Sequence, residues 1–582
     1  MTLVAASAAR VLAARGSREV LGASDPAGPL SATTTALLGG LPSWWARRAA
    51  AAGLTGSWLD LNHAIDQDAL VVTGRSDVFD AVETGEQLGH AYVEGLAAGV
   101  RARHGRHYTP PQLSRQLWTM TRSALGARAA ASSAPGLVRD PACGAGALLL
   151  PVVREQVQAL VRSDPGLALS RMPNVVEGVD TDPIAVHLAN VILAAEMLPL
   201  LAALPESRRR PLPTLARVGD GLAPADHPVR AVVMNPPYGR VRLDAAERAR
   251  FADVLYGHAN LYGLFLGAAL NDLDDEGVLA ALVPTSFTSG RYFTALRAGL
   301  SSRTHLREIS FVDSRSGVFS GVLQETCLAV FTRKRQTRTR LSSISDTVTP
   351  VAQVRASRGA GPWLLPRRAD DAPVAAAAAR MPLTLAAAGW RASTGPLVWN
   401  RRTADLHARP GRGRRRVLWA ADIDGGAVHR DPARDSLRYL DLTQPSDQKV
   451  MVLDQPAVLV QRTTAPEQTR RLVVAELSAS DLAAWDGAVV VENHVNVLRA
   501  VVDAPLLSRT TVTRLLSTVT MDRLMRCVSG SVAVSAYELD SLPLPSTEVL
   551  TEWEQTWPSL PDDRVEEMVR SIYWHEKKTA TQ

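Results

Sequence analysis

The sequence predicts an α/β protein whose core is a mainly parallel sheet. Three short apolar runs, at residues 137–140, 175–180 and 231–234, each stop at a turn rich in acidic, glycine or proline residues. A segment suited to a helix follows each of the first two turns. Short apolar runs bounded in this way are typical of buried parallel strands, and such sheets bind their ligands beyond the carboxyl ends of the strands. A functional site is therefore expected in these turns.

Composition narrows the class of protein. A chain of 582 residues with 46% hydrophobic and 21% charged residues suits a globular protein of about two to four domains. The net charge of +6 weakly favours an anionic partner. Cys143, Cys327 and Cys527 lie far apart, which predicts a reducing cytoplasm, no disulfide framework and no metal site. The apolar stretch 186–204 contains polar residues and a proline, so we expect a core helix and no membrane span.

The first part of the chain is predicted to be helical. Residues 1–82 are rich in alanine with helical spacing and form an N-terminal helical segment. From Glu83 to Arg101 the spacing of Leu88, Tyr92 and Leu96 predicts an amphipathic helix.

A Tyr108-Thr109-Pro-Pro motif comes next. Prolines suit the first turn of the helix that begins near Gln112, and the free N–H groups of that turn, with the Thr109 hydroxyl, make a seat for a carboxylate. An ordinary helix cap is the alternative that the residues leave open.

Three acidic turns follow the predicted strands. Asp140 precedes the turn that holds Ala142, Gly144 and Gly146, whose glycines let a ligand approach the backbone while the acid holds an ammonium group. On its own this glycine pattern can also be a simple tight turn. Asp180 ends the next strand, an arrangement that grips ribose hydroxyls in nucleoside-binding folds. Asp220 follows a third strand and suits an adenine amino group.

Asn235-Pro236-Pro237-Tyr238 ends the strand at 231–234, because prolines cannot continue a hydrogen-bonded ladder. The Asn235 oxygen and the Pro236 carbonyl form a pair of acceptors for an –NH2 group, and Tyr238 offers a flat face for a planar ring. A strand-ending turn without chemistry is the alternative.

Taken in this order, the motifs resemble those of the N6-adenine DNA methyltransferases that use S-adenosylmethionine. The resemblance covers residues 83–335 and is to the subgroup whose target recognition domain follows the catalytic motif. It implies a Rossmann-like class I methyltransferase domain. It also implies that Tyr108, Thr109 and the Asp140 turn hold the amino-acid end of the cofactor, Asp180 its ribose and Asp220 its adenine.

The resemblance assigns Asn235, Pro236, Pro237 and Tyr238 to catalysis. It implies that Phe319 stacks with Tyr238 on the target base, although Phe319 can equally be a core residue. The adenine is expected to leave the base stack before it reacts. The implied reaction is methyl transfer to N6 of adenine in a short duplex sequence, which protects host DNA in a restriction-modification system.

The remaining chain is predicted to bind DNA. Residues 336–395 change in composition and are interpreted as a linker, and residues 396–582 as an α+β target recognition domain that resembles those of type II methyltransferases. Basic clusters mixed with Asn, His and Thr suit phosphate contacts and base reading. The candidates are Arg401, Arg402, Arg462, Thr463, Arg470, Arg471, Asn493 and His494.

Pro561-Asp562 and Glu576-Lys577-Lys578 superficially match the signature of nucleases in which paired acids and a lysine coordinate magnesium. The residues between them have helical spacing, whereas such nucleases carry this signature on a strand, so we expect no cleavage activity. A separate cognate endonuclease and a monomeric enzyme are expected instead.

Three other functions remain open. The first is methylation of a glutamine or an RNA base, which the large basic C-terminal region disfavours. The second is a DNA-binding module without catalysis, which has no need for Asn235. The third is a modification subunit that depends on a separate specificity subunit; the fused recognition-like region favours an enzyme that acts alone.

Overall fold

The computed structural model describes residues 31–67, 82–96, 108–126, 136–161, 164–313, 325–464 and 468–574. The chain divides into two compact units. Unit 1 contains residues 1–283, 298–322 and 326–336, and unit 2 contains residues 284–297, 323–325 and 337–582.

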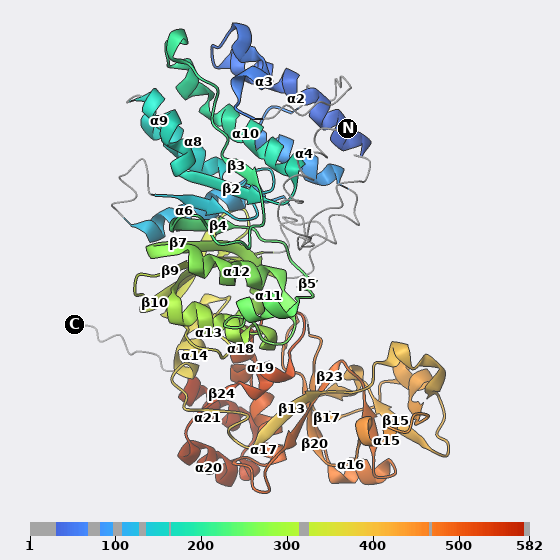
Figure 1. Ribbon diagram of the computed structural model, residues 1–582. Helices are drawn as coiled ribbons and strands as arrows, with labels where there is room; N and C mark the ends of the chain where they lie inside the picture. The colour runs from blue at the N-terminus through green and yellow to red at the C-terminus, as the bar shows by residue number, and fades with distance from the viewer. Residues whose placement is uncertain are drawn as a thin grey trace, which may run out of the picture. The chain divides into compact units, whose positions relative to one another are not determined.

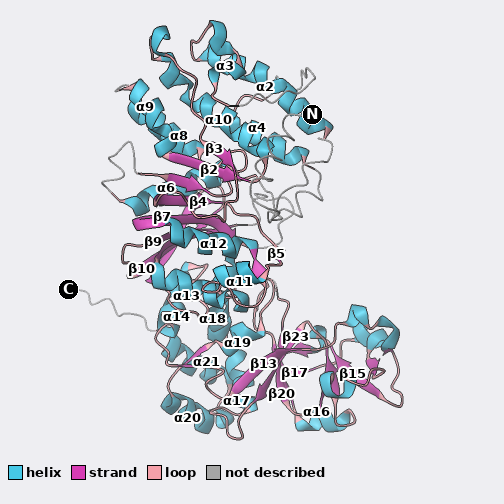
Figure 2. Cartoon of the chain, viewed as in Figure 1, coloured by secondary structure: helices cyan, strands magenta, loops and turns pink. Residues whose placement is uncertain are grey.

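Unit 1 contains seven neighbouring strands of a mixed sheet, in the order β8-β9-β7-β4-β1-β2-β3. Figure 1 labels β9, β7, β4, β2 and β3 of this run. The bounds are β1 Val138–Asp140, β2 Val176–Asp180, β3 Ala216–Val218, β4 Val229–Met234, β7 Leu273–Pro284, β8 His305–Val312 and β9 Thr326–Thr332. The run β3-β2-β1-β4-β7 is parallel throughout, whereas β8 and β9 pair antiparallel. Helices lie on both sides of this sheet (Figure 2), which confirms the predicted Rossmann-like α/β architecture.

The helices of unit 1 begin at the caps that the sequence provides. Thr84 and Gln87 form a reciprocal capping box at the start of α4, and Asp182 caps α10. The bounds are α2 Ala32–Ala51, α3 Leu61–Ala64, α4 Gly85–Gly95, α6 Pro111–Leu125, α8 Leu150–Leu160, α9 Pro165–Arg171, α10 Pro183–Ala202, α11 Ala245–Arg250 and α12 Leu261–Asp272; α13, Thr294–Arg303, has its last turns in this unit. The described part of the N-terminal segment is therefore helical, as predicted.

Helix α10 is the predicted core helix. It is long and apolar enough to cross a membrane, but 78% of its most apolar window is buried inside the structure. Its polar residues are satisfied locally: the Asn190 side chain donates to the Ala216 carbonyl and accepts from the N–H groups of Leu215 and Ala216. Burial lowers the pKa of His187 to about 4. A neutral imidazole and a hydrogen-bonded carboxamide explain how this helix carries polar groups into the core.

Strand β4 places the turn that contains Asn235, Pro236, Pro237 and Tyr238. Ala231, Val232, Val233 and Met234 are at most 1% exposed, because β1 and β7 flank the strand and helices cover the sheet. After the turn the chain forms a short hairpin of β5 (Arg240–Val241) and β6 (Ala259–Asn260). The main-chain N–H of Leu261 then donates to the Gly239 carbonyl, which closes the excursion against the turn.

Unit 2 holds several smaller sheets with their own apolar cores. Its main sheets have the orders β13-β23-β20-β21-β17-β16 and β14-β18-β15-β22-β19. A helical core around Trp553, Trp557 and Tyr573 is one of the clusters. The strands are β10 Arg338–Ile344, β11 Val348–Arg355, β12 Leu383–Thr384, β13 Trp390–Thr394, β14 Leu406–His407, β15 Arg414–Leu418, β16 Ile423–Asp424, β17 Gly426–Val428, β18 Tyr439–Asp441, β19 Val452–Leu453, β20 Ala457–Gln461, β21 Val474–Leu477, β22 Val489–Val491, β23 Val495–Ala500 and β24 Pro543–Leu544. The helices are α14 Ala372–Ala378, α15 Asp447–Val450, α16 Ala479–Ala484, α17 Arg509–Leu516, α18 Val519–Val528, α19 Ala536–Asp540, α20 Thr547–Thr556 and α21 Asp562–Tyr573.

The prediction that residues 336–395 form a linker is wrong. This segment contains the antiparallel β10-β11 pair, α14, β12 and β13. Strand β13 pairs along its whole length with β23, more than a hundred residues later in sequence, and β12 pairs with β24. Val374 and Trp390 belong to the main apolar core of unit 2. The segment is thus an integral part of unit 2.

The rejected nuclease signature falls on a helix. Residues 562–573 form α21, whose Val565, Val569 and Tyr573 face the core of unit 2. Helical spacing in this segment was predicted and is confirmed. Glu576, Lys577 and Lys578 lie outside the described residues.

Candidate active site

Four neighbouring parallel strands carry predicted site residues at their carboxyl ends. In the spatial order β3, β2, β1 and β4, these residues are Asp220, Asp180, Asp140 and Asn235. Because the strands all run in the same direction, their carboxyl ends meet at one edge of the sheet. The structure therefore gathers residues that lie almost a hundred positions apart in sequence.

The turn after β1 is open to a ligand. Gly144 and Gly146 have φ angles of +51° and +84°, in the left-handed region that favours glycine. A β carbon on Gly144 would meet no atom within 4 Å, so this face of the turn is free. The N–H of Cys143 donates to the Val179 carbonyl and ties the turn to β2.

Asp140 lies at the base of this turn. Its side chain is buried, and one carboxylate oxygen accepts from the Ala142 N–H at 3.0 Å. Burial raises the pKa of Asp140 to about 8, and the negative charge of Asp180 adds to this increase. Within the described ranges no cationic side chain forms an ion pair with it. A buried acid in this condition is suited to a ligand that brings its own ammonium group.

Asp180 and Asp220 are oriented by main-chain donors. The two oxygens of Asp180 accept from the Gly144 and Asp182 N–H groups, both at 2.9 Å. Each carboxylate oxygen has two lone pairs and can accept again, for example from a ribose hydroxyl. Asp220 accepts from the Leu222 N–H at 2.9 Å and is exposed.

Gly221 follows the predicted site residue Asp220, and only the structure explains why a glycine stands there. A β carbon at this position would lie 1.7 Å from the Pro141 carbonyl oxygen. The loop after β3 thus packs directly against the turn after β1, with only a hydrogen atom between them. The glycine was visible in the sequence as part of a turn, but its packing partner is eighty residues away.

The turn after β4, residues 235–238, forms a small hydrogen-bond network. The Asn235 side-chain nitrogen donates to the Thr109 hydroxyl at 2.9 Å, and the Tyr238 hydroxyl lies 3.0 Å from the Asn235 side-chain oxygen and 3.1 Å from the Leu282 carbonyl. The Tyr238 ring meets Tyr262 edge-to-face, with 6.0 Å between ring centroids. Burial raises the pKa of Tyr238 well above its usual range, so its hydroxyl is neutral and can donate.

The Tyr108-Thr109 motif reaches the same site. Thr109 is 5% exposed and precedes α6, where prolines occupy the first turn. The Tyr108 ring lies against α4: a β carbon on Gly89 would be 2.8 Å from it, and His90 meets it edge-to-face. The alternative interpretation of Thr109 as a helix cap is not realised, because its side chain does not cap α6 and contacts Asn235 instead. Phe319, the proposed second stacking residue, lies outside the described residues.

Three of the predicted DNA-binding arginines are engaged inside unit 2. Arg402 is 9% exposed and forms ion pairs with Asp447 and Asp405. Arg471 is fully buried and donates to the Ser531 and Val532 carbonyls. Arg470 donates to the carbonyls of residues 517 and 518. The prediction that Arg402 and Arg471 contact DNA is wrong. Their guanidinium groups donate hydrogen bonds to acceptors inside unit 2 and are buried away from solvent.

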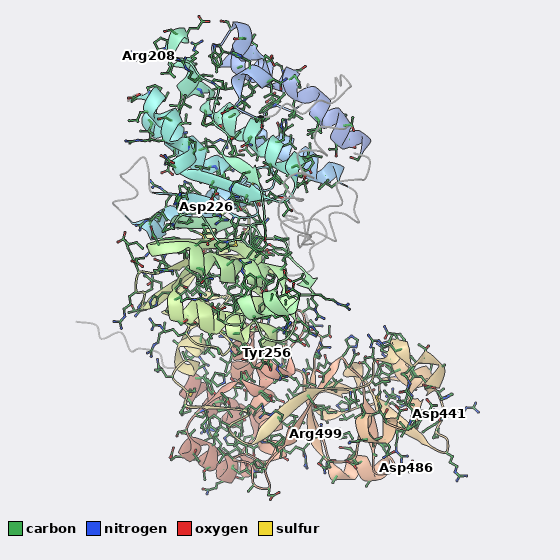
Figure 3. The ribbon with its side chains drawn as sticks, viewed as in Figure 1. Arg208, Asp226, Tyr256, Asp441, Asp486 and Arg499 are labelled. Carbon is green, nitrogen blue, oxygen red and sulfur yellow. The ribbon has the colours of Figure 1, made fainter. Side chains whose placement is uncertain are left out.

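The other candidates remain near the surface. Arg462, Asn493 and His494 lie together: the Arg462 N–H donates to the His494 carbonyl, and the Arg462 side chain donates to the Asn493 carbonyl. The exposed His494 ring is bonded to the buried Glu492 at 2.7 Å. Thr463 is exposed and bridges to Ala533. Arg401 is exposed, whereas Arg414 in the neighbouring basic segment pairs with Asp441. Figure 3 labels Asp441 among the side chains of unit 2.

Parts of this chain are similar in sequence to known proteins. Residues 228–319 match the Eco57I restriction-modification methylase family. The type II methyltransferase M.PstI of Providencia stuartii is 25% identical over 336 residues, which cover 55% of this chain and 66% of that protein. M.BsuBI of Bacillus subtilis, also a type II methyltransferase, is 21% identical over 332 residues, which cover 55% and 65%. The alignments span just under two thirds of either relative.

Among solved structures, the type IIL restriction-modification enzyme MmeI in complex with DNA aligns with a TM-score of 0.52 and 13% identity. The alignment covers 84% of this chain and 79% of that chain, and at this identity it shows a shared fold. Together with the strand order, these findings show that residues 228–319 are similar to the Eco57I restriction-modification methylase family, and that the chain shares its fold with a restriction-modification enzyme.

Proposed function

We propose that this chain transfers a methyl group from S-adenosylmethionine to N6 of an adenine in a short duplex DNA sequence. The observation that carries the proposal is the Asn235 side chain, held at the end of β4 with its oxygen turned toward the Tyr238 hydroxyl. An acceptor fixed in this way, next to the Pro236 carbonyl, suits the two hydrogens of an exocyclic amine.

The residues at the sheet edge fit the cofactor. The buried Asp140, which lacks a cationic partner among the described residues, would hold the ammonium group, and Tyr108 and Thr109 the carboxylate. Ala142, Gly144 and Gly146 form the open turn, and the Asp180 carboxylate, oriented by main-chain donors, suits ribose hydroxyls. Asp220 would accept from the adenine amino group. When bound, S-adenosylmethionine supplies a methyl group on a positively charged sulfur.

The chain's own residues would activate the target nitrogen. The lone pair of N6 is delocalised into the adenine ring, so the nitrogen is a weak nucleophile. Hydrogen bonds from the amine to Asn235 and Pro236 favour a more tetrahedral nitrogen, and acceptors that are already in place act where positive charge develops. The Tyr238 ring would support the extruded base by stacking, which offsets part of the few kcal/mol that unstacking costs.

Unit 2 would supply target recognition. Arg401, Arg462, Thr463, Asn493 and His494 are near its surface and offer the cationic and amide groups that contact phosphates and base edges. A catalytic and a recognition unit in one chain favour an enzyme that acts as a monomer, and three free cysteines favour the cytoplasm. A cognate endonuclease would act separately.

Methylation mapping tests the proposal. DNA from cells that express the intact chain, the Asn235→Ala variant or an Asn174→Ala control would be sequenced by a single-molecule method that detects N6-methyladenine. Asn174 is exposed and precedes the amino end of β2, whereas Asp180 lies at the carboxyl end of that strand. We expect one short methylated motif with the intact chain and the control, and a loss of at least a hundredfold in methylation with Asn235→Ala.

Other outcomes would redirect the assignment. Wild-type methylation in the Asn235→Ala variant would remove the proposed mechanism. An unmethylated genome with the intact chain would favour a partner-dependent modification subunit, a substrate other than DNA, or a DNA-binding protein without catalysis.

A further inference from the structure

The orientation of the Asn235 carboxamide decides whether it can act. One end of this group is an acceptor oxygen and the other is an –NH2 donor. Only the oxygen can accept a hydrogen from the target amine. If the group turned by 180°, it would present donors to a donor, and the proposed activation would be lost.

Tyr238 alone does not fix this orientation. Its hydroxyl has one proton and two acceptors within reach, the Asn235 oxygen at 3.0 Å and the Leu282 carbonyl at 3.1 Å. If the carboxamide were reversed, its nitrogen could donate to the Tyr238 oxygen while Tyr238 donated to Leu282. Both arrangements satisfy Tyr238, so another group has to distinguish them.

Thr109 is that group. Its buried hydroxyl lies 2.9 Å from the Asn235 nitrogen and accepts a hydrogen from it. A hydroxyl can also donate, and a Thr109 that gave its proton to Asn235 would favour the reversed carboxamide. Thr109 therefore enforces the productive orientation only when its proton is donated elsewhere.

We propose that Thr109 is a positioning residue that holds the Asn235 oxygen toward the target amine, and that the cofactor carboxylate completes this role by accepting the Thr109 proton. This inference rests on the proposed function, because the carboxylate seat at Tyr108 and Thr109 is part of it. With the proton committed to a carboxylate, Thr109 can only accept, and Asn235 can present only its oxygen.

Coupling between the two ligands follows. When the bound cofactor already holds Asn235 in this orientation, adenine binding no longer includes the free-energy cost of orienting the carboxamide. Each ligand therefore strengthens binding of the other by the same factor. S-adenosylhomocysteine retains the carboxylate and ammonium groups and should show this effect without reaction. We expect it to tighten binding of the target duplex about fivefold or more.

The test compares the intact protein with Thr109→Val, Thr109→Ser and a Thr119→Val control. Valine preserves the shape of threonine and removes the hydroxyl, whereas serine keeps the hydroxyl. Thr119 is an exposed residue of α6 whose hydroxyl donates to the Arg115 carbonyl within the helix. The probe is a duplex of the mapped sequence with 2-aminopurine at the target adenine, titrated with and without S-adenosylhomocysteine, alongside single-turnover methylation of the unmodified duplex.

We expect Thr109→Val to lose the coupling and to slow single-turnover methylation about ten- to a hundredfold at saturating cofactor. Thr109→Ser should recover most of both, and Thr119→Val should match the intact protein. Thermal unfolding of each variant separates this effect from a loss of folding.

Two results would overturn the inference. In one, Thr109→Val binds S-adenosylhomocysteine weakly yet methylates at the wild-type rate once saturated, which would make Thr109 a cofactor seat alone. In the other, the intact protein methylates its target but shows no coupling. Failure of the proposed function looks different, because the intact chain would then methylate no DNA under any condition.

Discussion

Asp140 gives the site a pH dependence whose sign follows from its burial. Burial raises its pKa to about 8, so the free protein holds a proton on this acid at neutral pH. An ammonium ligand needs the carboxylate, and binding must release that proton. Affinity for S-adenosylhomocysteine should therefore rise about tenfold per pH unit from pH 6 to 7.5 and level off near pH 8.

Calorimetry in buffers of different ionisation enthalpy measures this directly. At pH 7 we expect release of close to one proton per ligand bound, and in Asp140→Asn both the proton release and the pH dependence should disappear. An affinity that is flat with pH in the intact protein would show that Asp140 is already ionised before the ligand binds.

The positions of some residues can be predicted from the order of strands and turns in the sequence, whereas others depend on tertiary contacts. The sequence predicts that four residues meet at one edge of the sheet, because each ends or follows an apolar run and parallel strands share that edge. These residues are Asp140, Asp180, Asp220 and Asn235. The Thr109 contact was not predictable in this way, since it joins residues 126 positions apart. Arginines posed the same difficulty. Arg401 and Arg402 look alike in sequence, and only the fold shows that one is exposed and the other buried.

At the scale of elements, the packing of two loops depends on Gly221. A methyl group there would lie 1.7 Å from the Pro141 carbonyl oxygen, so Gly221→Ala must push the loop after β3 away from the turn after β1. We expect a loss of about 1–3 kcal/mol in unfolding free energy and at least a tenfold loss of S-adenosylhomocysteine affinity. Urea unfolding and calorimetry measure the two effects.

Gly166→Ala is the matched control. Its β carbon would make ordinary contacts of 3.6 Å with the Asp164 and Leu204 side chains, so stability and ligand affinity should stay unchanged or rise slightly. If Gly221→Ala behaved like this control, the two loops would be free to separate and the close packing would not matter for the site.

Element prediction succeeded where local pattern was enough. The parallel strands and α10 could be predicted, because their apolar residues are continuous and their caps lie next to them. Residues 336–395 could not, because their strands depend on distant partners: β13 on β23 and β12 on β24. The alanine, serine and arginine content of this segment resembles that of a linker. The strands that pair with it lie more than a hundred residues later in the sequence.

At the scale of the whole molecule, adjacent arginines separate stability from recognition. Arg402→Ala would leave the buried Asp447 without its cation, which should lower the unfolding free energy of unit 2 by about 3–5 kcal/mol. Arg401→Ala removes an exposed side chain, so stability should change by at most about 0.5 kcal/mol. If Arg401 contacts a phosphate, the slope of log affinity for the target duplex against log salt should fall by about 0.9.

Thermal unfolding and DNA titration at several salt concentrations distinguish the two variants, and S-adenosylhomocysteine affinity serves as the control for unit 1. That affinity should stay within about twofold of wild type in Arg401→Ala, because the glycine turn and the four strand ends belong to the other unit. A variant Arg402→Ala that unfolds normally and yet loses DNA affinity would mean that Arg402 leaves Asp447 to contact DNA. In that case the ion pair between Arg402 and Asp447 would form only in the absence of DNA. Arg402 would then be a DNA-binding residue and not a structural one.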